Sequence, residues 1–184
     1  QLNLNAGSTQ NLSQRGAQGL AVIGGVSRGS RIPKDYELYA NGEHVATKAY
    51  EIGNANLGVE TSTHTELGLQ WQGAKNTAQS ADKAALIVFT ARYDNFIYAA
   101  STGALSTEGH AVYRYSAAPA KFQGWEWSGN KRLDGSSDGG LDVAMRLSNV
   151  VATNLATQEP LPRTPPGRSC ARATSSPPRW TPAT

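Results

Sequence analysis

The chain alternates polar and apolar positions most strictly between residues 61 and 73, in the segment TSTHTELGLQWQG. The odd positions become increasingly apolar and end in Leu67, Leu69 and Trp71, whereas the even positions are polar apart from one glycine. A period of two residues is the signature of a β-strand whose two faces meet different surroundings. The segment therefore predicts a strand that lies either over the core of a soluble sheet or between lipid and a wet lumen.

Further strands are predicted along the chain, separated by turn signals. The N-terminal residues already alternate, and the other predicted strands cover 19–32, 84–99, 112–133 and 141–155. Between them, short polar turns are predicted at 74–83 and 134–140, and longer loops at 33–60 and 101–110. Short turns at one rim and long loops at the other are typical of outer-membrane barrels.

Two all-β architectures remain open on the strand pattern alone. A soluble β-sandwich also presents a polar face to water, so alternation does not exclude it. The predicted strands are far longer than the usual strand of about 5–6 residues. Trp125 and Trp127 also share one face, as in the aromatic girdle at a membrane interface. These features favour an antiparallel transmembrane β-barrel segment over a sandwich.

Composition narrows the class of protein. The chain has 184 residues, which suit one domain or a piece of one, and a mean hydropathy of −0.45. No apolar run approaches the roughly 20 residues of a transmembrane helix. The 17 basic residues are scattered rather than clustered, so we expect no nucleic-acid partner. A single cysteine, Cys170, excludes an internal disulfide framework.

Several phrases of the chain resemble those of the TonB-dependent outer-membrane receptors. The longest is SRGSRIPKDYELYANGEHVATKAYEIGNANLGVETSTHTELGLQW, and it is followed by ARYDNFIYAASTG, AKFQGWEWSGNKRL and NLATQEPLPRTPP. The matches cover about residues 18–166 and occur in the order of the family. Single phrases are weak signals, but their succession in one order is a strong one.

The resemblance implies an incomplete part of a 22-stranded barrel that an N-terminal plug closes in the family. It implies active import of a scarce nutrient across the outer membrane of a Gram-negative bacterium, with the metal ion zinc, an iron–siderophore or haem as candidates. The expected partners are the nutrient ligand, outer-membrane lipid and, through a plug missing here, the TonB complex. No enzymatic activity and no cofactor are expected; a transported zinc ion or iron chelate is substrate. The alternative is a soluble β-rich binding module such as a lectin-like sandwich.

Composition divides the chain into two parts. Residues 1–159 are expected to form the partial β-barrel. Residues 160–184 are rich in proline, arginine and serine, and they show no alternation. Such a segment cannot build strands, so we expect a disordered tail or the product of a shifted reading frame.

Candidate ligand residues lie in the first long loop. His44 is the candidate metal ligand, and His44, Glu43 and Tyr36 are candidates for substrate binding, because NGEHVAT resembles the loop of zinc- and haem-type members. Imidazole is a good zinc ligand, and carboxylates such as those of Glu37 and Asp35 could add oxygen atoms. The alternative is a loop histidine that is hydrogen-bonded for structure only.

The remaining polar residues are expected to be structural. His64 lies on the polar face of its strand, and His110, in a loop with Glu108, is expected to be solvated. The charged residues expected on the lumen side, where they would pair across neighbouring strands, are Arg92, Asp94, Glu126 and Arg146. No nucleophile with an adjacent base stands out, which agrees with the expectation that the chain is not an enzyme.

Overall fold

The computed structural model describes residues 3–15, 18–75, 81–132 and 142–161, and most of these are in strands. The elements are β1 (Asn3–Arg15), β2 (Gln18–Arg31), α1 (Asp35–Tyr39), β3 (Asn41–His44), β4 (Ala49–Ile52), β5 (Glu60–Lys75), β6 (Ala81–Leu105), β7 (Ala111–Arg132) and β8 (Asp142–Asn154). The predicted all-β class is therefore confirmed. Residues 76–80 of the first predicted short turn, the whole of the second at 134–140, the tail beyond residue 161 and Cys170 lie outside the described residues. No helix in the described part is long and apolar enough to cross a membrane.

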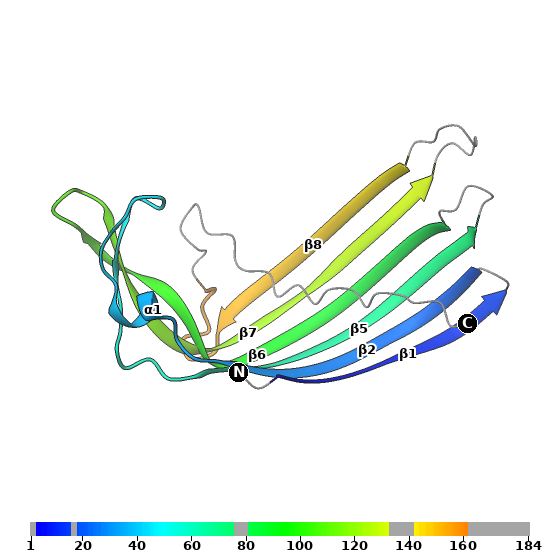
Figure 1. Ribbon diagram of the computed structural model, residues 1–184, viewed down its shortest axis with the longest axis horizontal. Helices are drawn as coiled ribbons and strands as arrows, with labels where there is room; N and C mark the ends of the chain where they lie inside the picture. Colours follow the sequence, from blue (N-terminus) through cyan, green and yellow to red (C-terminus); the bar gives the residue numbers. More distant parts are fainter. Residues whose placement is uncertain (1–2, 16–17, 76–80, 133–141, 162–184) are drawn as a thin grey trace.

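The described strands form one open sheet (Figure 1). β1, β2, β5, β6, β7 and β8 lie side by side in that order, and each neighbouring pair is antiparallel. The sheet curves like part of a barrel wall (Figure 1). Within the described residues no second sheet covers it, and Leu67 remains 57% exposed. The sandwich alternative is therefore wrong for this part of the chain.

β6 and β7 are the longest strands and extend beyond their neighbours. Their register shifts between Tyr93 and Phe96, and past this point the two strands turn away from the sheet as a projecting hairpin (Figure 1). The loop predicted at 101–110 is therefore largely strand, and only residues 106–110 connect β6 to β7.

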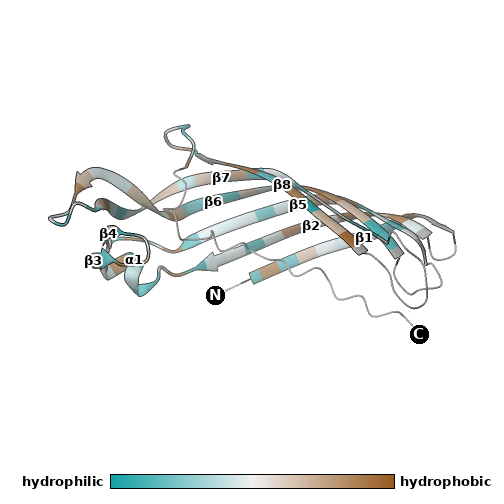
Figure 2. Ribbon diagram, turned by 90° about the horizontal axis from the view of Figure 1, so that it is seen from above, coloured by the Kyte–Doolittle hydropathy of each residue, from teal (hydrophilic) through white to brown (hydrophobic). Residues whose placement is uncertain are grey.

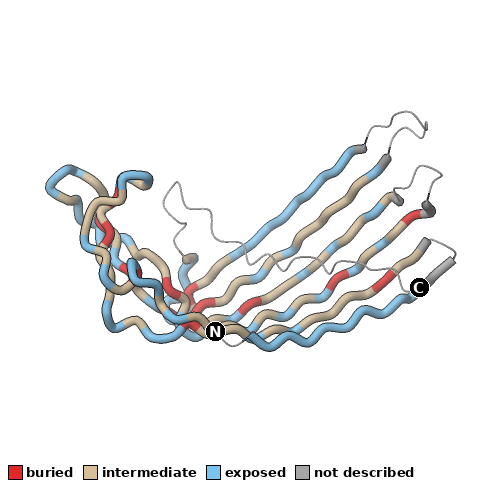
Figure 3. The backbone as a smooth tube through the Cα atoms, viewed as in Figure 1, coloured by how far each residue is buried: buried red, intermediate tan, exposed pale blue. Residues whose placement is uncertain are grey.

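The loop predicted at 33–60 contains α1 and the short β3–β4 hairpin, which the alternating pattern did not predict. β4 pairs in parallel with the projecting part of β7, from Ala49 opposite Ala111 to Ile52 opposite Arg114. The pairing fastens the first long connection to the second, so both lie at the same end of the molecule (Figure 1). Buried residues gather where these loops meet the sheet (Figure 3).

Cross-strand register sorts the side chains onto two faces, because residues directly opposite each other share a face. One face carries an apolar band that crosses β5 to β8, and brown and teal positions alternate along these strands in Figure 2. The members of the apolar band are Leu67, Leu69, Trp71, Leu86, Val88, Trp125, Trp127, Met145 and Leu147. The polar face carries His64 and Glu66, as the alternation predicts.

Arg92 does not lie on the polar face. It pairs with Thr63, an odd-numbered residue of β5 that shares its face with Leu67 and Leu69. The predicted lumen-side position of Arg92 is therefore wrong. That of Asp94 is wrong too, because its Oδ2 accepts a hydrogen bond from the hydroxyl of Thr61, which shares the face of Thr63. Glu126 and Arg146 lie on the polar face as predicted. The alternation of β6 alone could not decide which face was which, because Ile87 and Phe89 put apolar side chains on the polar face of the sheet.

Candidate ligand site at the loop end

Arg31, the last residue of β2, anchors the first long loop to the sheet. Its Nη1 donates to Glu37 Oε2 at 2.8 Å, and its Nε donates to Glu60 Oε1 at 2.9 Å. Both carboxylates are buried, at 6% and 7% exposure. Burial disfavours the charged guanidinium, but the hydrogen bonds to Glu37 and Glu60 outweigh it and raise the pKa of Arg31 above its ordinary value. The loop is therefore held at its base by a permanent charge.

Glu37 also shapes α1. Its Oε2 accepts a hydrogen bond from the backbone N–H of Lys34 at 2.8 Å, so the carboxylate lies at the helix N-terminus, where negative charge is favoured. Its backbone carbonyl accepts from the N–H of Asn54 at 2.8 Å. The N–H of Gly53 donates to the carbonyl of Ala40 at 2.6 Å. These bonds close the loop around α1 and set where β3 begins.

The three candidate residues Tyr36, Glu43 and His44 line one open hollow of about 520 Å³. Glu51 also lines it and accepts a hydrogen bond from the hydroxyl of Tyr115 at 2.8 Å. The structure thus brings the predicted substrate-binding residues together at the loop end. Ligand binding by them stays a prediction.

His44 contacts its own turn. Its Nδ1 lies 3.1 Å from Thr47 Oγ1, and the N–H of Thr47 donates to the carbonyl of His44 at 3.1 Å. This is the contact that a structural role would make. The other ring nitrogen, Nε2, has no hydrogen-bond partner among the described residues and stays available to a ligand.

The side chain of Glu43 contacts the second long connection, between β6 and β7. Its Oε2 pairs with His110 Nδ1, and its Oε1 accepts from the hydroxyl of Ser106 at 2.8 Å. The expectation that His110 is merely solvated is therefore wrong. The parallel pairing of β4 with β7 brings the two residues together although they are 67 positions apart in the chain.

Glu108 completes a cluster with these two residues. One ligand atom each from Glu43, Glu108 and His110 lie within 4.8 Å of one another. Two carboxylate oxygens and one imidazole nitrogen suit a divalent cation, with a further coordination position left for water or for a carrier molecule. We name these three residues the rim cluster. Sequence reasoning missed it because Glu108 and His110 carry no signal beyond their types.

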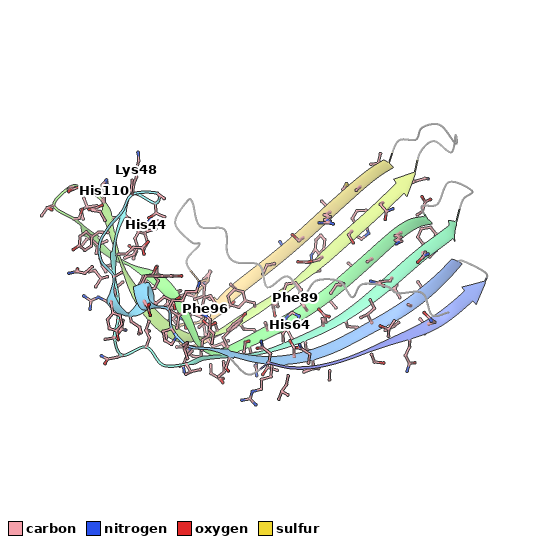
Figure 4. The ribbon with its side chains drawn as sticks, viewed as in Figure 1. His44, Lys48, His64, Phe89, Phe96 and His110 are labelled. Atoms are coloured by element: carbon pink, nitrogen blue, oxygen red, sulfur yellow. The ribbon has the colours of Figure 1, made fainter. Side chains whose placement is uncertain are left out.

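The other candidate residues do not join the rim cluster. Glu37 is committed to Arg31 and Lys34, and Asp35 is outside the group. His44 is also outside it, although Figure 4 shows His44 and His110 at the same loop end. His64 lies away on the sheet, stacked 5.7 Å from the ring of Phe89 (Figure 4).

Comparison with known proteins agrees with this architecture. The family described as TonB dependent receptor-like, beta-barrel matches residues 15–181. Among solved structures, the siderophore receptor PirA from Pseudomonas aeruginosa is similar, with a TM-score of 0.55 and 21% sequence identity over 83% of this chain. At that identity the likeness concerns the fold alone. The match spans 28% of the length of PirA.

The family match covers most of the chain, and the open, curved antiparallel sheet has the form of an incomplete barrel wall. Members of the family are receptors and transporters of the outer membrane rather than enzymes. The chain belongs to the TonB-dependent receptor family and matches the β-barrel domain of that family.

Proposed function

We propose that this chain is part of an outer-membrane receptor that imports a scarce nutrient with energy from the TonB complex. The nutrient is a divalent metal ion such as zinc, or an iron–siderophore or haem, and it is captured at the end of the sheet that carries the long connections. Longer loops face the cell exterior in outer-membrane barrels, so this end would meet the incoming ligand first.

One observation carries the proposal. The first long connection folds back onto the β6–β7 hairpin, so that a hollow lined by Tyr36, Glu43 and His44 adjoins the carboxylates and imidazole of the rim cluster. Glu43 belongs to both groups and couples them. Chemically, the arrangement combines donors for a metal ion with an aromatic and polar wall for a larger chelate.

The proposal that the nutrient is a divalent metal ion is tested on the purified chain in a neutral detergent. Zinc affinity is measured by competition with a chromophoric chelator for the chain itself and for the variants H110A, E108Q and H44A. A loss of at least tenfold in H110A and E108Q, with little change in H44A, supports the rim cluster as the zinc ligands. A loss of zinc affinity in H44A alone would instead identify His44 as the zinc ligand.

A zinc affinity that none of these variants changes would contradict the metal ion as the nutrient. The receptor carrying these residues would then be assayed for growth on iron–siderophore or haem as sole iron source. His64→Ala is the matched control in both assays, because His64 is a half-buried histidine of the sheet outside the loop end. Imidazole must lose its proton to bind a metal, so zinc capture should weaken in acid.

A further inference from the structure

Three cations form a row on the face of the sheet that carries the apolar band. Arg28 of β2 lies opposite Thr63 of β5, Thr63 lies opposite Arg92 of β6, and Arg92 lies opposite Lys121 of β7. Residues paired in this way share a face. Arg28 and Arg92 are exposed, and Lys121 is half-buried. We name Arg28, Arg92 and Lys121 the cation row.

The cation row lies just beyond one border of the apolar band, and Thr65, Thr90 and Gln123 lie between the two on the same face. On β7, Lys121 and Lys131 share this face and are ten residues apart, with Trp125 and Trp127 between them. At about 3.3 Å per residue they are separated by roughly 33 Å, the length of a tilted strand that crosses a bilayer. Lys121 is thus just beyond the border near the long connections, and Lys131 is at the opposite one.

The row carries an electrostatic cost within the sheet. Like charges directly opposite each other on one face are destabilising, and Arg92 faces Lys121 in this way. Among the described residues, none of the three cations has an ion pair or hydrogen bond. Asp94 lies two positions along β6 from Arg92, but its Oδ2 accepts from the hydroxyl of Thr61 at 2.6 Å. A bound anion would remove the repulsion.

We propose that the cation row binds the phosphate groups of a lipid headgroup in the outer leaflet of the membrane. The row has the right depth, because it lies just beyond the apolar band at the end that carries the long, exterior connections. It has the right chemistry, because arginine forms paired hydrogen bonds to phosphate and lysine adds a point charge. The inference rests on the outer-membrane position proposed above and adds a lipid-binding site to it.

The test compares two double variants of the full chain in neutral detergent. R92Q/K121Q removes two charges from the row, and R146Q/K131Q removes two charges elsewhere on the same sheet. Arg146 lies on the polar face, and Lys131 lies at the other border of the band. Binding of diphosphoryl lipid A, presented in phosphatidylcholine mixed micelles, is measured by native mass spectrometry. Far-ultraviolet circular dichroism reports whether each variant keeps its sheet.

R92Q/K121Q is expected to weaken lipid A binding by about fivefold or more per charge removed, and R146Q/K131Q to leave it nearly unchanged. Adding R28Q to the first variant should weaken binding further. Equal weakening by both double variants, or equal binding of phosphatidylcholine alone, would overturn the site. Tight binding of soluble inorganic polyphosphate without lipid would overturn the assignment to a lipid headgroup.

A failure of the outer-membrane proposal gives a different result. The unsubstituted chain would then fold and remain monomeric without detergent and would not enter the mixed micelles. That outcome overturns both proposals, whereas entry into micelles without selectivity for phosphate overturns the cation row alone.

Discussion

Arg31 and Glu60 form a two-point ion pair between the end of β2 and the start of β5. The guanidinium Nε donates to Oε1 at 2.9 Å, and Nη2 donates to Oε2 at 3.1 Å. The same Oε2 accepts from the backbone N–H of Ile97 at 2.9 Å. The pair therefore joins both ends of the first long connection to the point where β6 turns away from the sheet.

Glu60→Gln should loosen this connection. The amide keeps the shape but loses the charge that holds Arg31, and hydrogen bonds to charged groups are worth about 1.5–3 kcal/mol. Arg31 is 28% exposed, so we expect the lower part of that range. Hydrogen exchange of the amides at 34–54 should become faster. Glu66→Gln, on the same strand and face, is the control, and unchanged exchange in the Glu60 variant would contradict the anchoring role.

Gly53→Ala should displace the loop around α1. A Cβ at this position would lie 2.5 Å from the carbonyl carbon and oxygen of Leu38, and backbone atoms cannot move aside cheaply. Overpacking of this kind costs about 1–3 kcal/mol. Gly24→Ala is the matched control, because its Cβ would meet nothing within 4 Å. Limited trypsin digestion at Lys34 and Lys48 measures the effect, and equal cleavage of both variants would show that the loop tolerates the methyl group.

A charge in the apolar band should prevent membrane insertion. Leu69 lies in the middle of the band, so Leu69→Arg would place a charge where an arginine costs about 2–4 kcal/mol at the midplane of a barrel. Gln70, the next residue, points to the polar face, so Gln70→Arg should be tolerated. Insertion of the two variants of the receptor into liposomes is compared by protease protection. Equal insertion would mean that the apolar band does not face lipid.

The isolated chain should aggregate in plain buffer. β1 and β8 each pair with one neighbour only among the described strands, and unpaired edges invite association. The apolar band would also lie in water, with Trp125 40% exposed. Size-exclusion chromatography with light scattering, with and without detergent, measures this. A monodisperse monomer that melts cooperatively in buffer would contradict the barrel-wall interpretation.

The sequence by itself determined that the chain forms long strands with two unlike faces. Alternation with a period of two is a local property, so residues 61–73 reveal it without any knowledge of their neighbours. The phrases that resemble the family, read in order, also led to the family that the comparison shows. Tyr36, Glu43 and His44 could be named together from the sequence because they lie close to one another within the first long loop.

Only the tertiary structure decided which face was which and which loops meet. Thr63 lies opposite Arg92 through cross-strand register, and no pattern within β6 contains that information. The parallel pairing of β4 with β7 likewise brings Glu43 to His110 over 67 positions of the chain. Contacts at such separations depend on the path of the whole backbone, whereas side-chain alternation depends only on adjacent residues.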